Sequence, residues 1–376
     1  MAEDMSSIRS IPTEMITEIL YRLPAKSVGR FRCVSKGWLS LLTEPAFITT
    51  HYSKTLNHNH LVFQSCKNRS LYSLSFGYHQ DKLSNPTKIR LKPPNTFYGC
   101  CNGLVLVSVF NREFGHNLVL INPTTKESLD LPACTLEGIL NKMMVIHVMY
   151  GFGYDSVTDD YKVIALIYFS SYDKAIQDIH YVSVYSLRSN IWKRLFDYPY
   201  DHWHNHWYDW KCLSDAFVNG CLHWVAKKGR DYPPVIVSFS LADEKFRKVP
   251  LPNLGKGVDI MSFDDCKLVD LGGKLAVLLH CKGEVWLMNK YEVRKSWTRI
   301  LLNGLMSLNE FPIMEPLIFD HHGKILFVCR DLMLIYNAET GRFRKLFVTR
   351  QNLKDLDVRG MYVESLVSPE KFRTTN

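Results

Sequence analysis

The sequence lacks the segments that would carry a chain out of the cell or into a membrane. Its first ten residues, MAEDMSSIRS, contain acidic residues and lack the apolar stretch of a secretion signal. No later apolar run approaches the roughly 20 residues that are needed to cross a bilayer. The ten cysteines are scattered without a CxxC pair, which is typical of reduced, buried thiols rather than of a disulfide framework. We therefore expect an intracellular protein, in the cytoplasm, the nucleus or both, with no membrane partner.

The common motifs of catalysis and cofactor binding are also missing. There is no GxSxG elbow, no HExxH pair and no GxxxxGKS or GxxxxGKT loop, and the pair Gly151 and Gly153 lacks the third glycine and the following helix of a dinucleotide site. With ten cysteines and 14 histidines a cysteine–histidine nucleophile stays formally open, although nothing pairs these residues in the sequence. We expect no cofactor and no catalytic role.

The composition indicates a folded chain with much β structure and a basic character. At 376 residues the chain is two to three times the usual domain size, and its 19 Tyr, 20 Phe and 8 Trp favour strands. The formal net charge is +9, and the segment from Pro24 to Lys54 holds five Lys and Arg residues against Glu44. This favours an acidic partner. Nucleic acid is disfavoured, because the other cationic residues are interleaved with Asp and Glu.

The segment from Ile11 to about Tyr52 has the spacing of helices. Pro12 suits a first helical turn, Ser27 can cap a second helix, and the prolines 24 and 45 act as stops, so that three short helices are expected. The first helix carries a row of apolar residues at helical spacing: Met15, Ile16, Ile19, Leu20 and Leu23. A unit of about 40 residues cannot enclose so many apolar side chains unaided. They pack either on the rest of the chain or on another protein.

From about Leu61 the pattern changes to short alternating runs that predict antiparallel hairpins. The runs recur as a unit with a turn glycine: Gly220, Gly273 and Gly323 are 53 and 50 residues apart, and Gly103 lies 117 residues before Gly220. A period near 50 is typical of kelch-type propeller blades. We therefore expect an α+β, multidomain chain: a small N-terminal three-helix unit followed by an all-β, kelch-like propeller of five or six blades, the first near residues 58 to 76.

The helical segment resembles an F-box of the plant type. The matching features are Pro12, the Leu23-Pro24 pair, Val28, the run RFRCVSK at 30–36, Trp38, and the closing Pro45, Phe47 and His51. In that family the helices bind the Skp adaptor, which connects to a cullin and a RING subunit. The resemblance thus implies a substrate-recognition subunit of an SCF ubiquitin ligase, which presents a protein target for ubiquitination and proteasomal degradation. It also implies an acidic partner, because the Skp adaptor of that family is acidic.

The remainder resembles the type-1 plant F-box-associated (FBA) interaction domain. Its marks include CCNGLVLV at 100–107, INPTTKESLDLP at 121–132, GFGYDSVTDDYKVI at 151–164 and YVESLVSP at 362–369. We expect a flexible N-terminus at 1–10, the F-box at 11–52, an F-box-associated β-propeller-like domain at 53–370 that binds the target, and a C-terminal tail at 371–376.

Seven F-box residues are expected to contribute to the contact with the Skp adaptor, because apolar anchors typically carry most of the energy of an interface. They are Pro12, Leu20, Leu23, Pro24, Val28, Val34 and Trp38. A role inside the helical bundle is the alternative for each of them, and for Leu20, Val28 and Val34 the two interpretations are balanced.

The stretch YPYDHWHNHWYDW at 198–210 is the conspicuous candidate for chemistry. Three alternating imidazoles could hold zinc, but same-face residues of a strand are ~7 Å apart, so that a straight strand is a poor chelator. We expect no metal there and favour a target-binding loop, with packing between blades as the alternative. Its residues are His202, Trp203, His204, His206, Trp207, Tyr208 and Trp210.

Two other functions remain as alternatives: a lectin-like or sequestering module that acts outside an SCF complex, and a metal-dependent propeller enzyme. The Asp155, Asp159 and Asp160 group could suggest calcium or acid–base chemistry, but YDSVTDDYKV has the composition of a β-turn in which Asp side chains bond the backbone.

Overall fold

A computed structural model describes most of the chain. The described residues are 11–55, 59–76, 85–91, 95–111, 115–134, 143–171, 179–195, 216–226, 235–253, 266–279, 282–302, 315–319, 323–329, 332–346 and 355–372. Within them, no helix is long and apolar enough to span a membrane.

The N-terminal unit has four helices, one more than expected. They are α1 (Thr13–Tyr21), α2 (Ala25–Phe31), α3 (Lys36–Leu41) and α4 (Pro45–Lys54). Pro45 does not only stop the third helix, because its fixed φ angle and missing N–H suit the first position of the fourth. Pro24 takes the N-cap position of α2 in place of the expected Ser27, and Ser35 caps α3 by accepting a hydrogen bond from the Trp38 N–H at 3.2 Å.

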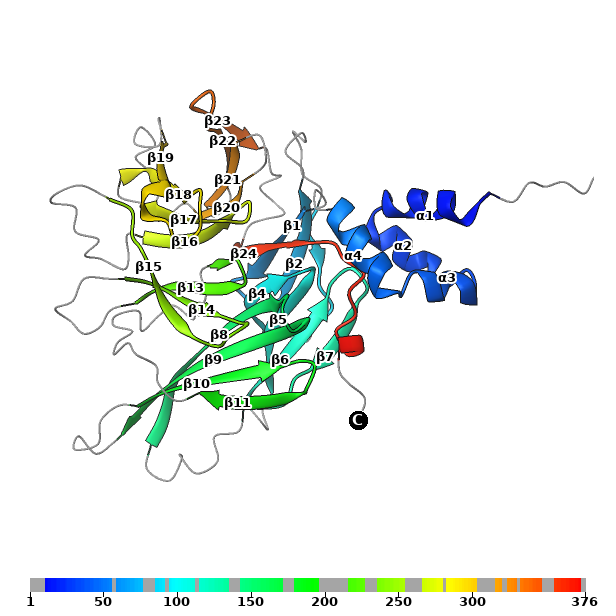
Figure 1. Ribbon diagram of the computed structural model, residues 1–376, viewed down its shortest axis with the longest axis horizontal. Coiled ribbons are helices and arrows are strands. Elements are labelled where there is room, and N and C mark those ends of the chain that lie inside the picture. The colour runs from blue at the N-terminus through cyan, green and yellow to red at the C-terminus, as the bar shows by residue number, and fades with distance from the viewer. Residues whose placement is uncertain are drawn as a thin grey trace, which may run out of the picture.

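Six four-stranded antiparallel sheets follow among the described residues, and each sheet is one propeller blade (Figure 1). Blade 1 has β24 (Leu356–Val363), β1 (Asn59–Ser65), β2 (Leu71–Phe76) and β3 (Thr87–Lys88); blade 2 has β4 (Asn95–Cys101), β5 (Leu104–Asn111), β6 (Gly115–Asn122) and β7 (Glu127–Asp130); blade 3 has β8 (Met143–Asp155), β9 (Asp160–Ser171), β10 (Ile179–Ser186) and β11 (Ile191–Leu195). Blade 4 has β12 (Ala216–Val218), β13 (Cys221–Ala226), β14 (Val235–Ser240) and β15 (Phe246–Val249); blade 5 has β16 (Cys266–Leu271), β17 (Lys274–Leu279), β18 (Glu284–Met288) and β19 (Trp297–Leu301); blade 6 has β20 (Glu315–Phe319), β21 (Lys324–Cys329), β22 (Leu332–Asn337) and β23 (Arg342–Leu346). The expected helical unit followed by a propeller is confirmed, with six blades.

The blades close into a ring through six hydrophobic clusters, one between each pair of neighbours. In going round the ring from blade 1 these clusters include Val62 with Val105, Leu106 with Val163, Ile164 with Leu222, Ile236 with Val277, Leu278 with Phe327, and Leu326 with Phe63. Consecutive residues of one strand point to opposite faces of a sheet. Each blade therefore contributes to two clusters, which explains why its central strands are apolar on both faces.

The C-terminal strand β24 completes blade 1. It pairs antiparallel with β1, so that Met361 lies opposite Leu61 although 300 residues separate them in the sequence. The first blade therefore extends beyond residues 58 to 76, because one of its strands comes from the other end of the chain.

The repeat expected from the turn glycines is confirmed. Gly103, Gly220, Gly273 and Gly323 occupy the corresponding first turn of blades 2, 4, 5 and 6, and all four have a positive φ, between 69° and 80°. Side chains disfavour this left-handed conformation. In blade 3 the same turn is the Asp155–Asp160 segment, which carries Asp159 at φ 52°.

Seven described cysteines are free thiols. Cys101 and Cys221 are buried as expected, whereas Cys33 and Cys66 are exposed.

Candidate interaction surfaces

The helical unit exposes an apolar stripe along α1. Met15 and Ile19 are 58% and 53% exposed, and their spacing of four residues places them on one side of the helix; Ile11, which precedes the helix, is 58% exposed. Val34, which lies just before α3, and Leu39, within α3, are exposed as well, at 62% and 46%. Single exposed apolar residues are ordinary on a protein surface, but a row of them is typical of an interaction site. We call Ile11, Met15, Ile19, Val34 and Leu39 the apolar stripe.

The seven residues predicted for the adaptor contact fall into three groups. Pro12, Pro24 and Val34 are exposed, and Leu23 and Trp38 are half-buried. Leu20 and Val28 are buried in the helical core, together with Ala25, Leu42 and Phe47. Within this core Phe31 packs edge-on against Trp38, with 5.6 Å between the ring centroids.

The helical unit also carries four exposed cationic residues, close in sequence to the stripe: Arg22, Lys26, Arg30 and Lys36. Arg22 forms an ion pair with Glu18 at 3.2 Å. Lys54 of α4 forms a second ion pair with Glu18 at 2.9 Å, and this second pair joins the first and last helices. Lys54 also lies over the Tyr21 ring, 4.8 Å from its centroid. The surface therefore combines apolar contact area with positive charge.

The residues predicted for target binding, His202 to Trp210, lie outside the described residues. The strand ends that flank them can be placed. We call the face of the propeller that contacts the helices the near face. The Asn102–Gly103 turn lies there, because Gly103 abuts Ser365 of the segment that packs on the helices.

Contacts between turns extend the near face to blades 3 and 4. The Phe372 ring packs on Tyr161, which follows the first turn of blade 3, and the Lys162 ammonium donates to the Leu241 carbonyl in the last turn of blade 4. Because strands alternate in direction, Leu195 at the end of β11 and Ala216 at the start of β12 lie on the opposite, far face. The stretch between them thus leaves and re-enters the described fold on the face remote from the helices.

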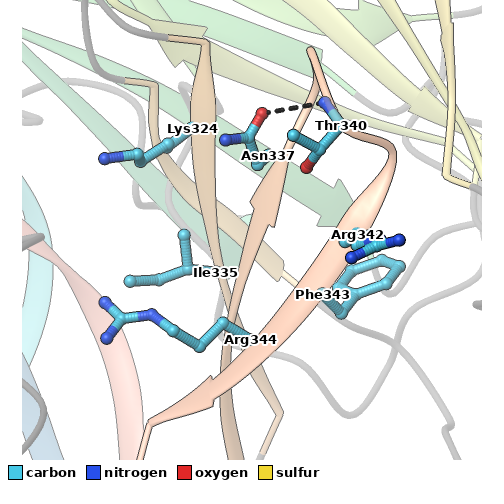
Figure 2. Close-up of a pocket in the computed structure, with 7 residues that line it drawn as sticks. All are labelled: Lys324, Ile335, Asn337, Thr340, Arg342, Phe343 and Arg344. Atoms are coloured by element: carbon cyan, nitrogen blue, oxygen red, sulfur yellow. Dashed lines mark hydrogen bonds between the residues drawn. The ribbon is translucent and has the colours of Figure 1, made fainter.

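A shallow pocket of about 470 Å³ lies on blade 6. Figure 2 shows its residues on β21 to β23: Lys324, Ile335, Asn337, Thr340, Arg342, Phe343 and Arg344. The Asn337 side chain accepts the Thr340 N–H at 3.1 Å and thereby shapes the turn at its rim. Three cationic side chains around Ile335 and Phe343 attract acidic groups in general.

The acidic group of blade 3 has a structural role, as the β-turn interpretation predicted. Asp155 accepts the Val157 N–H at 3.0 Å and the Thr158 hydroxyl at 2.6 Å. Asp160 accepts the Arg188 N–H at 2.9 Å and so ties this turn to the turn between β10 and β11 of the same blade. Elsewhere in the described part of the chain, no three His, Cys, Asp or Glu side chains gather as metal ligands would.

Four helices joined to a six-bladed propeller define a protein with two structurally distinct parts. A family model of the F-box domain matches residues 8–50, and a family model of the F-box associated beta propeller domain matches residues 62–369. The chain therefore belongs to the F-box proteins with an F-box associated β-propeller domain, and the expected resemblance is confirmed.

Similar proteins from Arabidopsis thaliana agree with this assignment. An F-box/kelch-repeat protein is 30% identical over an alignment of 399 positions, which covers 97% of this chain and 98% of that protein. F-box protein CPR1 is 30% identical over 346 residues, which span 84% of this chain and 78% of CPR1. Among solved structures, TolB from Acinetobacter baumannii matches with a TM-score of 0.39 and 10% identity, over 84% of this chain and 72% of that chain, and this likeness is too low to support an argument.

Proposed function

We propose that this protein is the substrate-recognition subunit of an SCF ubiquitin ligase. Its F-box binds a Skp-family adaptor, and through it a cullin and a RING subunit. Its propeller binds a protein target for ubiquitination and proteasomal degradation. The observation that carries the proposal is the apolar stripe on a helical unit that the F-box family matches.

The apolar stripe has the properties of an interface core. Full burial of one Met, Ile, Leu or Val side chain contributes about 1.5–3 kcal/mol, and five such side chains are at least 46% exposed here. The exposed cationic residues of the helical unit add attraction to an acidic adaptor and speed its encounter. This surface thus supplies both the energy and the charge complementarity that adaptor binding needs.

The seven predicted adaptor residues have two tasks in this proposal. Pro12, Pro24 and Val34 contact the adaptor directly, and the half-buried Leu23 and Trp38 contribute their exposed edges. Leu20 and Val28 act indirectly: they are buried in the F-box core and fix the spacing of the helices that carry the exposed residues.

The target binds the far face in this proposal. The aromatic and imidazole side chains between 202 and 210 are of the kinds that dominate interface energetics. Loops on a rigid scaffold vary without disturbing the blades beneath them, which suits the recognition of a particular target. Binding there would leave the near face and the helices free for the adaptor.

The chain acts without chemistry of its own. Holding the target and the ubiquitin-charged enzyme in one assembly converts a bimolecular transfer into a reaction within a complex, which raises the effective concentration of the target lysines. This task needs no cofactor and no catalytic residue from this chain, and it places the protein in the cytoplasm, the nucleus or both.

The test is co-isolation of partners from plant cells with the proteasome blocked. Val34→Asp places a charge in the apolar stripe, and Ile191→Asp is its control, because Ile191 is equally exposed on blade 3 at 63%. We expect Val34→Asp to lose the adaptor and the cullin while Ile191→Asp keeps both. A Trp203→Ala/Trp207→Ala/Tyr208→Ala variant should keep the adaptor and lose the target. Wild-type protein that captures neither adaptor nor cullin would refute the receptor function and favour a sequestering module.

A further inference from the structure

The chain continues beyond β24 as a buried segment that crosses from the propeller to the helices. We call Glu364–Ser368 the C-terminal strap. All five of its residues are at most 9% exposed. Figure 1 shows the strap, in red, running from β24 to α4. Five consecutive buried residues in a segment without regular secondary structure require partners on both sides for their backbone groups.

Leu366 of the strap is part of the F-box core. Its side chain is fully buried and clusters with five buried residues of the helical unit: Leu20, Ala25, Val28, Leu42 and Phe47. No other buried member of this cluster comes from outside the helices. Leu366 also lies beside Gly29 of α2, where a Cβ atom would make an ordinary contact of 3.9 Å with a Leu366 methyl group. The last residues of the chain thus complete a core that the first residues begin.

The Arg32 guanidinium fastens the strap from the helical side. It donates to the Leu366 carbonyl at 2.9 Å and to the Leu42 carbonyl at 3.3 Å, so that one side chain joins the strap to the end of α3. Its other nitrogen lies 3.6 Å from the Glu127 carboxylate of blade 2. Arg32 therefore bonds the helices, the strap and the propeller at once.

Asn122 fastens the strap from the propeller side. Its amide nitrogen donates to the Ser365 carbonyl at 3.0 Å and to the Val367 carbonyl at 2.7 Å. Its amide oxygen accepts the N–H groups of Thr124 and Thr125 at 2.8 and 3.2 Å, which fixes the orientation of the fully buried side chain. An amide side chain suits this position, because its NH₂ group donates two hydrogen bonds to the strap while its oxygen accepts two from the turn.

The remaining contacts of the strap are close on both of its sides. A Cβ atom at Gly103 would lie 2.8 Å from the Val363 carbonyl oxygen and still closer to the Ser365 side chain. Val367 enters the cluster between blades 2 and 3, and Ile48 of α4 packs at the edge of both that cluster and the F-box core. Glu364 pairs with His60 of β1 at 3.1 Å.

We propose that the C-terminal strap is the element that locks the F-box to the propeller in one fixed orientation, with Asn122 and Arg32 as positioning residues and Leu366 as the shared core residue. Adaptor-binding helices and target-binding face then form one rigid body. If the proposed function holds, this rigidity sets where a bound target lies relative to the ubiquitin-charged enzyme. The strap follows directly on β24, the strand that closes the propeller. An F-box that can bind the adaptor therefore depends on closure of the propeller.

The lock is tested by the distance between the two parts in full-length protein. Spin labels carried by unnatural amino acids at the exposed positions Thr49 of α4 and Arg294 report the orientation of the helices relative to blade 5. Asn122→Asp keeps the acceptor for the turn and replaces the donor with a carboxylate that faces two carbonyl oxygens. We expect a single narrow distance in the wild type and its loss in Asn122→Asp. Leu366→Ala should have the same effect.

The controls separate a loss of the lock from a general loss of stability. Asn289→Asp is the matched control for Asn122→Asp. The Asn289 amide nitrogen donates to the Ser296 carbonyl and to the Thr298 hydroxyl, both in blade 5 and not in the strap. Leu287→Ala opens the core between blades 5 and 6. Both should keep the narrow distance, even where the melting temperature falls. An unchanged distance in Asn122→Asp and Leu366→Ala, or an equal broadening in the controls, would overturn the proposal.

Adaptor binding is measured on the same samples, so that the two proposals fail separately. A narrow wild-type distance that Asn122→Asp broadens supports the lock, even if no adaptor binds and the receptor function falls. Adaptor binding together with a broad wild-type distance would uphold the receptor function and overturn the lock.

Discussion

The buried lysine between blades 3 and 4 offers a quantitative test of the fold. The Lys162 side chain is 8% exposed, and its ammonium lies 3.1 Å from the Asp155 carboxylate, which is 1% exposed. It also donates to the Leu241 carbonyl at 2.6 Å and lies 3.5 Å from Glu244. Lys162→Met keeps most of the volume but leaves Asp155 as a buried charge without its cation. We expect the free energy of unfolding to fall by about 3–5 kcal/mol.

Lys193→Met is the matched control. Lys193 bonds the same Glu244 at 2.6 Å, but its side chain is 65% exposed. Exposed ion pairs contribute about 0–1 kcal/mol, so that this variant should stay within about 1 kcal/mol of the wild type. Urea denaturation of the full chain, followed by tryptophan fluorescence, measures both variants.

The deficit of Lys162→Met should depend on pH. Burial alone raises the pKa of Asp155, but in the wild type hydrogen bonds from Thr158 and Lys162 outweigh it and lower that pKa. The wild type therefore gains stability from Asp155 above the unfolded pKa and loses it as the pH falls. Without Lys162 the buried carboxyl prefers its neutral form, so that the deficit should be largest near neutral pH and shrink on acidification. Equal losses in Lys162→Met and Lys193→Met, or a deficit that grows on acidification, would refute the reasoning.

Four further substitutions have defined outcomes. Gly103→Ala combines a positive φ with a clash against the strap, whereas Gly220→Ala has the positive φ and no atom within 4 Å, so that Gly220→Ala should cost about 1–2 kcal/mol and Gly103→Ala clearly more by denaturant titration. Gly29→Ala meets only an ordinary contact and should raise F-box stability by up to about 1 kcal/mol, measured by hydrogen exchange of α2 amides. Burial lowers the pKa of His223 from 6.5 to about 4, so that wild-type stability should fall by up to about 3 kcal/mol as the pH drops through that window, because the unfolded chain takes up the proton first. His223→Gln should flatten this part of the pH–stability curve, and an unchanged slope would contradict the assignment.

The repeating part of the propeller was predictable because its signals are local. A turn that needs a positive φ selects glycine, and a blade packed on both faces selects apolar central strands, so that Gly103, Gly220, Gly273 and Gly323 marked four of the six blades. Strand β24 carried no such signal. Its residues are mostly half-buried and include Arg359 and Gly360, and its pairing with β1 joins the two ends of the chain.

The sequence indicated which residues of the helical unit are apolar, but not which of them are exposed and which are buried in its core. The apolar residues of α1 and of the turn after it face two ways. Ile16, Leu20 and Leu23 pack in the F-box core, whereas Met15 and Ile19 are exposed. Adjacent positions such as Ile19 and Leu20 have the same apolar character, so that only the docking of the helices distinguishes them. The sequence did not predict the contact between the strap and blade 2. Both partners lie in family motifs, at 121–132 and 362–369, and the structure joins these motifs through the hydrogen bonds of Asn122.

The central claim is that the apolar stripe of the F-box is the docking site of the adaptor, and calorimetric titration of the full chain with a purified plant Skp adaptor tests it most directly. Met15→Ser/Ile19→Ser removes two exposed side chains of α1, and Val157→Ser/Ile191→Ser removes two still more exposed ones from blade 3. The account predicts that the first pair weakens binding roughly 30- to 100-fold, as the loss of two half-buried apolar contacts requires, and that the second pair leaves the affinity unchanged. Equal affinity of the wild type and both variants would contradict it.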